Sequence, residues 1–301
     1  AYHAQPDALL LNFGAMSIDL KINESTVVVV PEEAPKDWAF VSEINLTGGG
    51  CGAWKNGMSV DFAKAGRDVV VTVKGNYPRR CGQSRLPIRV PAQDWLWESW
   101  VQEIWLQLGG KFAGPQGGQV IKGVTPANTI ALYTHYGKPL SDLIKQINKW
   151  SSNVMARHLE LAVAGTPEAF NVQLKDWLKQ QGISSNDWFF ENGSGLSRDT
   201  RIDAKGLVEF LRNMAARSDF PDFLASFPRA GADGTLHRRV TNVDGFAYLK
   251  TGSLNGVRSL GGYLRDREGQ LWAVGVLVKS PRAYDSWGPM ESLLEFLYRA
   301  E

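Results

Sequence analysis

Residues 246–253, FAYLKTGS, form an apolar, strand-like run that ends in a cation, a hydroxyl, a glycine and a second hydroxyl. Lys250 supplies a point charge, and the hydroxyls of Thr251 and Ser253 can each donate a hydrogen bond. Gly252 has no Cβ, so a ligand backbone can lie against the strand edge. This combination is typical of a strand that binds a carboxylate, although the end of a strand turning into a loop has the same pattern.

A second motif, Ser151-Ser152-Asn153, lies about a hundred residues upstream, between two segments whose apolar spacing predicts helices, 140–147 and 154–163. A hydroxyl and a carboxamide two residues apart at such a junction can point into one cleft, where Ser151 would relay a proton and Asn153 would hold an amide. Helix capping is the alternative, because Ser and Asn are favoured N-cap residues. The order S-x-N followed by K-T-G-S resembles that of the penicillin-recognising serine peptidases, and this resemblance favours the catalytic interpretation.

K-T-G, S-x-x-K and S-D-N together mark the penicillin-recognising serine enzymes. From its first residue to its last, the chain resembles the class C low-molecular-mass penicillin-binding proteins, which are the D-alanyl-D-alanine carboxypeptidases and endopeptidases of the penicillin-binding protein 4 type. The resemblance is carried by the blocks 5–13 (QPDALLLNF), 192–198 (NGSGLSR), 232–239 (ADGTLHRR) and 250–254 (KTGSL). It implies an α+β fold, a β-lactamase/transpeptidase-like antiparallel sheet packed with helices and preceded by a β-rich accessory domain.

The resemblance also implies an activity and the residues for it. The reaction would cleave the D-alanyl-D-alanine end of peptidoglycan stem peptides, or cross-links between them, through an acyl-enzyme that β-lactam antibiotics also form. Ser151 would shuttle a proton, Asn153 would hold the acyl-side amide and Lys250 would set the electrostatics of the site. The substrate carboxylate would be bound by Thr251, Gly252 and Ser253. The backbone N–H of Ser253 would be one oxyanion donor.

One motif of this family is missing. No serine of the sequence has a lysine three residues on, so the nucleophile of S-x-x-K is not among these residues. Ser17 and Ser141 have lysines four residues on, in other settings. We therefore expect the chain to be the C-terminal part of a longer serine peptidase and to be inactive alone. The rival hypothesis is a non-catalytic peptidoglycan-binding or assembly module on the same fold. A β-lactamase is disfavoured, because a large β-rich region precedes S-x-N.

The composition is that of an ordinary globular protein. A chain of 301 residues with 44% hydrophobic content can form one large or two moderate domains. The 33 basic and 31 acidic residues give a net charge of +2, which does not support a nucleic-acid partner. No apolar run is long enough to span a bilayer and no signal-peptide pattern opens the chain, so we expect no transmembrane segment and a mature or truncated start. Four isolated His and two Cys give no metal-ligand cluster, so we expect no metal or cofactor. The oligomeric state stays open.

Cys51 and Cys81 both lie in loops beside strand-like segments, and the sequence has no third cysteine to compete. We predict a disulfide between them, with a buried pair of free thiols as the alternative. A disulfide would indicate an oxidising compartment. Together with the resemblance, it implies an exported, periplasmic protein.

Three regions are expected: a β-rich accessory region at 1–108, incomplete at its N-terminal side, a Gly-rich connector at 109–127, and a penicillin-recognising catalytic region at 128–301. Strands are predicted in the first region at 17–22, 26–30 and 68–74. A helix is predicted at 94–108, with Asp94 as its N-cap and Trp95, Trp97, Trp100, Ile104, Trp105 and Leu108 on a core or domain-interface face. Sugar stacking is the alternative role for its tryptophans.

In the last region the pattern predicts a short strand at 128–136 and a strand pair at 259–265 and 270–278. Helices are predicted at 139–147, 154–163, 166–181, 203–214, 221–227 and 289–299.

Overall fold

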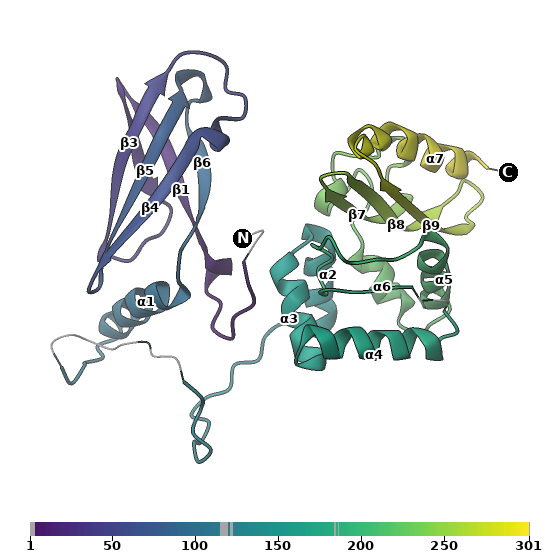
Figure 1. Ribbon diagram of the computed structural model, residues 1–301, viewed down its shortest axis with the longest axis horizontal. Coiled ribbons are helices and arrows are strands. Elements are labelled where there is room, and N and C mark those ends of the chain that lie inside the picture. Colours follow the sequence, from purple (N-terminus) through teal and green to yellow (C-terminus); the bar gives the residue numbers. More distant parts are fainter. Residues whose placement is uncertain (1–3, 115–119, 121–122, 184, 186, 301) are drawn as a thin grey trace. The chain divides into compact units, whose positions relative to one another are not determined.

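The computed structural model describes residues 4–114, 120, 123–183, 185 and 187–300. The chain forms two compact units, one of residues 7–132 and one of residues 133–300 with residues 4–6 (Figure 1). No helix of the described residues is long and apolar enough to cross a bilayer.

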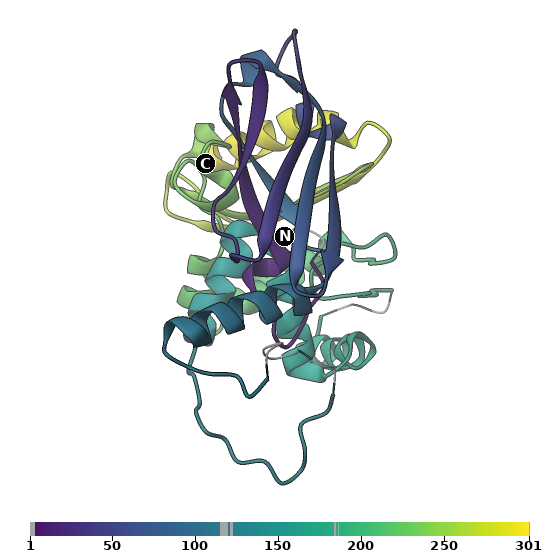
Figure 2. The ribbon, with the colours of Figure 1, turned by 90° about the vertical axis from the view of Figure 1, so that its left-hand side faces the viewer.

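The first unit is built from two three-stranded sheets (Figure 2). One sheet has the order β2-β1-β6 and is antiparallel, and the other has the order β3-β5-β4, with β3 parallel to β5. The strands are β1 (Ala15–Asn23), β2 (Thr26–Pro31), β3 (Trp38–Thr47), β4 (Met58–Ala65), β5 (Asp68–Pro78) and β6 (Ser84–Arg89). The three strands predicted from the sequence in this unit are confirmed as β1, β2 and β5.

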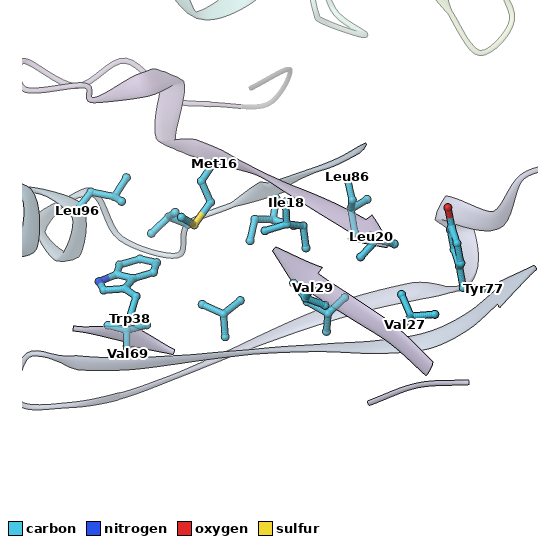
Figure 3. Close-up of a cluster of buried hydrophobic side chains, with 14 residues drawn as sticks. Met16, Ile18, Leu20, Val27, Val29, Trp38, Val69, Tyr77, Leu86 and Leu96 are labelled. Carbon is cyan, nitrogen blue, oxygen red and sulfur yellow. The ribbon is translucent and has the colours of Figure 1, made fainter. Parts of the chain in front are cut away.

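Side chains from both sheets form one core (Figure 3). Strand periodicity places alternate residues on the inner face. In β5 the inward residues Val69, Val71 and Val73 are therefore buried, whereas Val70 between them is exposed. Ile18 and Leu20 of β1 reach the same core from the other sheet.

Helix α1 (Gln93–Gln107) corrects two details of the sequence prediction. The helix begins one residue before Asp94, so Asp94 lies in the first turn, where its charge complements the helix dipole, and is not the N-cap. Only the first half faces the core, through Leu96 and the neighbouring Trp95 and Trp100. Ile104 and Trp105 in the second half, and Leu108 just after the helix, are 49%, 47% and 79% exposed, so a place in the core is wrong for them, whereas a domain-interface face stays a prediction.

The predicted disulfide is confirmed. Cys51 and Cys81 are bonded, with their Cα atoms 5.0 Å apart, within the usual range for a disulfide. The bridge ties the segment before β4 to the end of β5, where the hydroxyl of Tyr77 also donates a hydrogen bond to the carbonyl of Gly82.

The second unit has an antiparallel sheet, β7 (Ala247–Leu254), β8 (Val257–Arg265) and β9 (Leu271–Lys279), in the order β7-β8-β9. Helix α7 (Trp287–Arg299) covers one face, with Met290 and Leu294 in the core. Helix α5 (Ala204–Ala215) covers the other face (Figure 1). It approaches closely because the sheet presents Gly261 and Gly275 there, where an added Cβ would lie 3.1 Å from a side chain of α5. This arrangement confirms the predicted strand pair and helix packing.

The remaining helices are α2 (Leu140–Trp150), α3 (Asn153–Ala164), α4 (Pro167–Gln180) and α6 (Phe220–Ser226). They confirm the predicted helices to within a few residues. At the start of α4 the side chain of Thr166 accepts a hydrogen bond from the N–H of Ala169. Asp203 caps α5 in the same way, through the N–H of Gly206.

The prediction of a strand at 128–136 is wrong. These residues form neither helix nor strand, and Ile130, Leu132, Tyr133 and Tyr136 are exposed. A strand forms only where a neighbouring strand takes up its backbone hydrogen bonds. No described segment pairs with this stretch, which explains the failure of the prediction.

Candidate functional site

The junction between α2 and α3 presents Ser151 in an unusual conformation. Ser151 follows the last residue of α2 and has φ 54° and ψ 48°, in the left-handed region that a helix end usually gives to glycine. The N–H groups of Ser151 and Ser152 both donate to the carbonyl of Ile147, which closes the end of α2. Asn153 then begins α3. Ser151 ends α2 through its backbone N–H, and the N-cap position of α3 belongs to Ser152, so the interpretation of Ser151 as an N-cap is wrong.

Strand β7 brings Lys250 to this junction. The ammonium of Lys250 donates to the hydroxyl of Ser151 at 2.8 Å and to the carbonyl of Thr251 at 2.9 Å. Residues 250–253 lie inside the strand and pair with β8 from Gly261 to Arg258, so the alternative of a strand already turning into a loop is wrong.

Gly252 pairs with Ser259 of β8, and an added Cβ at Gly252 would lie 2.2 Å from the Ser259 hydroxyl oxygen. The close approach of this hydroxyl explains why the motif has a glycine at this position. It leaves the surface of the strand flat next to Lys250 and Thr251.

One cleft, called the motif cleft below, gathers both motifs. It is lined by Ser151, Asn153, Ser194, Gly195, Leu196, Lys250, Thr251, Gly252, Ser253, Leu254, Val257 and Ser259. Its volume of about 140 Å³ is below the roughly 300–1,000 Å³ of typical ligand pockets. The motif cleft therefore has room for a small group such as the end of a peptide.

The loop after Asn192 forms one wall of the motif cleft. The Asn192 side chain accepts hydrogen bonds from the N–H and the hydroxyl of Ser194 and donates to the carbonyl of Leu196. These bonds hold the tight turn in which Ser194, Gly195 and Leu196 reach the cleft. The sequence singled out this block by resemblance, without assigning Ser194 to a site.

Lys250 is the only charged side chain among the cleft-lining residues, and no carboxylate there compensates its burial. Desolvation therefore lowers the pKa of Lys250 from 10.5 to about 8. A lysine in this condition can give up and regain a proton near neutral pH more readily than a solvated one.

All six predicted site residues thus lie around one cleft, although their motifs are about a hundred residues apart in the sequence. Sequence reasoning missed the contribution of β8, where Ser259 faces Gly252, because pairing partners are not visible in a single strand. Within the described residues no group of three or more His, Cys, Asp or Glu could hold a metal ion.

Comparison with known proteins gives the family. The D-Ala-D-Ala carboxypeptidase 3 (S13) family model matches residues 1–288. The chain is 32% identical to D-alanyl-D-alanine carboxypeptidase DacB of Haemophilus influenzae over 66% of its length, and 32% identical to a D-alanyl-D-alanine carboxypeptidase of Actinomadura sp. (strain R39) over 51%. These matches cover 43% and 32% of the two relatives, so the matched residues span less than half the length of either.

Solved structures agree on the fold. Penicillin binding protein 4 (dacB) from Haemophilus influenzae, crystallised with a novel β-lactam, superposes with a TM-score of 0.74 at 24% identity, over 99% of this chain and 70% of the other. A second crystal structure of that protein gives a TM-score of 0.70 at 23% identity, over 94% of this chain and 67% of the other. The neighbour shares the mixed α and β architecture with a β-rich part, and the family model spans most of the sequence: the chain belongs to the D-Ala-D-Ala carboxypeptidase 3 (S13) family.

Proposed function

We propose that the motif cleft is part of the active site of a serine-type D-Ala-D-Ala carboxypeptidase or endopeptidase that acts on peptidoglycan stem peptides through an acyl-enzyme. The observation that carries this proposal is the 2.8 Å hydrogen bond from the Lys250 ammonium to the Ser151 hydroxyl, which joins the two motifs in one place. Family membership supports the substrate class.

Ser151 and Lys250 form a proton relay in this proposal. A lysine whose pKa is lowered to about 8 exchanges its proton readily with a neighbouring hydroxyl. The Ser151 hydroxyl both donates and accepts, so it passes a proton between Lys250 and the leaving amine of the substrate. Asn153 opens α3 on the wall of the motif cleft and holds the amide on the acyl side.

The carboxylate end of the substrate lies along β7. The hydroxyls of Thr251 and Ser253 donate to it, and the positive charge of Lys250 attracts it. Gly252 adds no side chain to the strand beside Ser259, on the face opposite to that of the two hydroxyls. The N–H of Ser253 serves as one oxyanion donor, because it lies on the strand at the edge of the cleft.

The nucleophile is supplied from outside these 301 residues, because the sequence contains no S-x-x-K. The chain alone therefore forms no acyl-enzyme with a β-lactam. The same absence is the observation that favours the second candidate, a non-catalytic peptidoglycan-binding or assembly module on this fold. Both candidates place the protein outside the cytoplasm, in the periplasm, where a disulfide such as Cys51–Cys81 persists.

Peptide binding to this chain tests the site. A peptide ending in D-Ala-D-Ala is titrated against the isotope-labelled protein, with the same peptide amidated at its C-terminus as the control. We expect the free carboxylate to shift the amide resonances of Thr251 and Ser253, the amidated peptide to leave them unchanged, and Lys250→Met to abolish the effect. Equal shifts of these amide resonances with both peptides would show that β7 does not bind the carboxylate.

A further inference from the structure

Ser151 is held in a conformation that costs free energy. A non-glycine residue in the left-handed region is strained, and such residues persist only where the surrounding structure fixes them. The strained residue is also the one that accepts the hydrogen bond from Lys250. The contacts that fix the end of α2 therefore also determine whether the Ser151 hydroxyl reaches Lys250.

The end of α2 is fixed by an ion pair of Lys149, two residues before Ser151. The ammonium of Lys149 lies 2.8 Å and 2.6 Å from the two carboxylate oxygens of Asp233. The side chain of Lys149 is only 14% exposed and that of Asp233 is 45% exposed, so the pair is partly shielded from water. Asp233 is itself held in place, because its carboxylate oxygen accepts a hydrogen bond of 2.8 Å from the backbone N–H of Arg229.

The backbone next to Asp233 lies directly against α2. At Gly234, with φ +56°, an added Cβ would be 2.5 Å from the carbonyl oxygen of Lys149. A further hydrogen bond, from the Asn148 side chain to the hydroxyl of Ser226, ties the same helical turn. The last turn of α2 is thus held by residues between positions 226 and 234.

This segment is also joined to β7, the strand that carries Lys250. The N–H of Ala230 donates to the carbonyl of Ala247, and the N–H of Leu249 donates to the carbonyl of Pro228, both at 2.9 Å. Ala230 is fully buried. Asp233 therefore belongs to a rigid support that is common to both partners of the Ser151–Lys250 hydrogen bond.

We propose that Asp233 and Lys149 are positioning residues, whose ion pair holds the strained Ser151 turn against β7 so that its hydroxyl meets Lys250. The inference rests on the proposed function for its catalytic meaning, because Ser151 and Lys250 are the proton relay of that proposal. Neither Lys149 nor Asp233 lines the motif cleft, so both act through Ser151.

Amide hydrogen exchange in this chain tests the positioning role, because the N–H of Ser152 is bonded to Ile147 only while the turn is closed. In Asp233→Asn and in Lys149→Met we expect the Ser152 amide to exchange about fivefold faster or more, with the protected amides of β8 unchanged. The control is Asp219→Asn, which removes the ion pair of Arg217 and Asp219 in the same unit. It should leave Ser152 unchanged.

Two outcomes would overturn the proposal: unchanged exchange at Ser152 in both variants, or equal acceleration at Ser152 and throughout β8, which would reduce the ion pair to a general stabilising role. A crystal structure of Asp233→Asn gives a second readout. We expect Ser151 to leave the left-handed region and to lose Lys250, and an unmoved Ser151 would count against us.

A titration of Lys250 in the unsubstituted chain separates this inference from the proposed function. If Lys250 titrates near 10.5 while Asp233→Asn still opens the turn locally, the positioning role stands and the proton relay fails. If Lys250 titrates near 8 and the variants leave the turn closed, the relay stands and the positioning role fails.

Discussion

Burial of Lys250 makes the stability of the second unit depend on pH, and the sign follows from the two pKa values. In the folded protein the pKa of Lys250 is lowered by burial to about 8, against 10.5 for a solvated lysine. Between these values the unfolded chain binds the proton that the folded protein has lost. The free energy of unfolding therefore rises with pH in this window, and the penalty is largest below pH 8.

The linkage relation gives the magnitude. Raising the pH from 7 to 9.5 should increase the free energy of unfolding of the second unit by about 2 kcal/mol through Lys250 alone. Lys250→Met has no such proton, so the difference in stability between the natural protein and this variant should change by the same amount. Other titrating groups are common to both proteins and cancel in the difference.

Urea unfolding at the two pH values measures this difference. The methyl resonances of Leu249, Leu264 and Val274 report on the second unit alone, because all three lie in its core. Parallel pH dependence in the natural protein and Lys250→Met would refute the reasoning, since it would mean that Lys250 has its ordinary pKa in the folded state.

Two further predictions concern the two units separately. Gly252→Ala should destabilise the second unit by about 1 kcal/mol in urea unfolding, because its Cβ would displace the Ser259 hydroxyl. The control Gly288→Ala meets open space in α7 and should be neutral or stabilising; equal losses would contradict the close contact. Replacing Cys51 and Cys81 by Ala should lower the stability of the β-rich unit by about 3–4 kcal/mol, seen in a calorimetric scan as a fall in its transition. A simultaneous fall in the transition of the second unit would contradict this assignment.

The local patterns of the sequence predicted much of the molecule. The valine-rich run at 69–73 identifies β5, and Thr166 with Pro167 marks the start of α4, because each signal depends on neighbours a few residues away. The shared cleft of Ser151 and Lys250 was predicted from the resemblance to a known family, because neither motif alone decided between a site and an ordinary helix cap or strand end. The disulfide followed from the presence of only two cysteines.

Long-range contacts account for the rest. Lys149 and Asp233 are 84 residues apart in the sequence, and nothing in the sequence around either residue indicates that the two form an ion pair. The left-handed conformation of Ser151 was hidden for a similar reason, because a serine after a helix is ordinarily a candidate N-cap. The failure at 128–136 has the same cause: strand propensity is local, whereas the pairing that completes a strand is not.

Labelling with a fluorescent penicillin, followed by intact mass and peptide mapping of the adduct, tests the central claim most directly. The natural gene product and this 301-residue chain are treated side by side, with Lys250→Met of the former as the control. We expect a natural gene product that contains S-x-x-K to be acylated at the serine of that motif. Its Lys250→Met variant should not be labelled, and this chain should remain unlabelled. Two results would contradict the account: acylation of the 301-residue chain by itself, or a natural gene product that contains S-x-x-K and stays unlabelled.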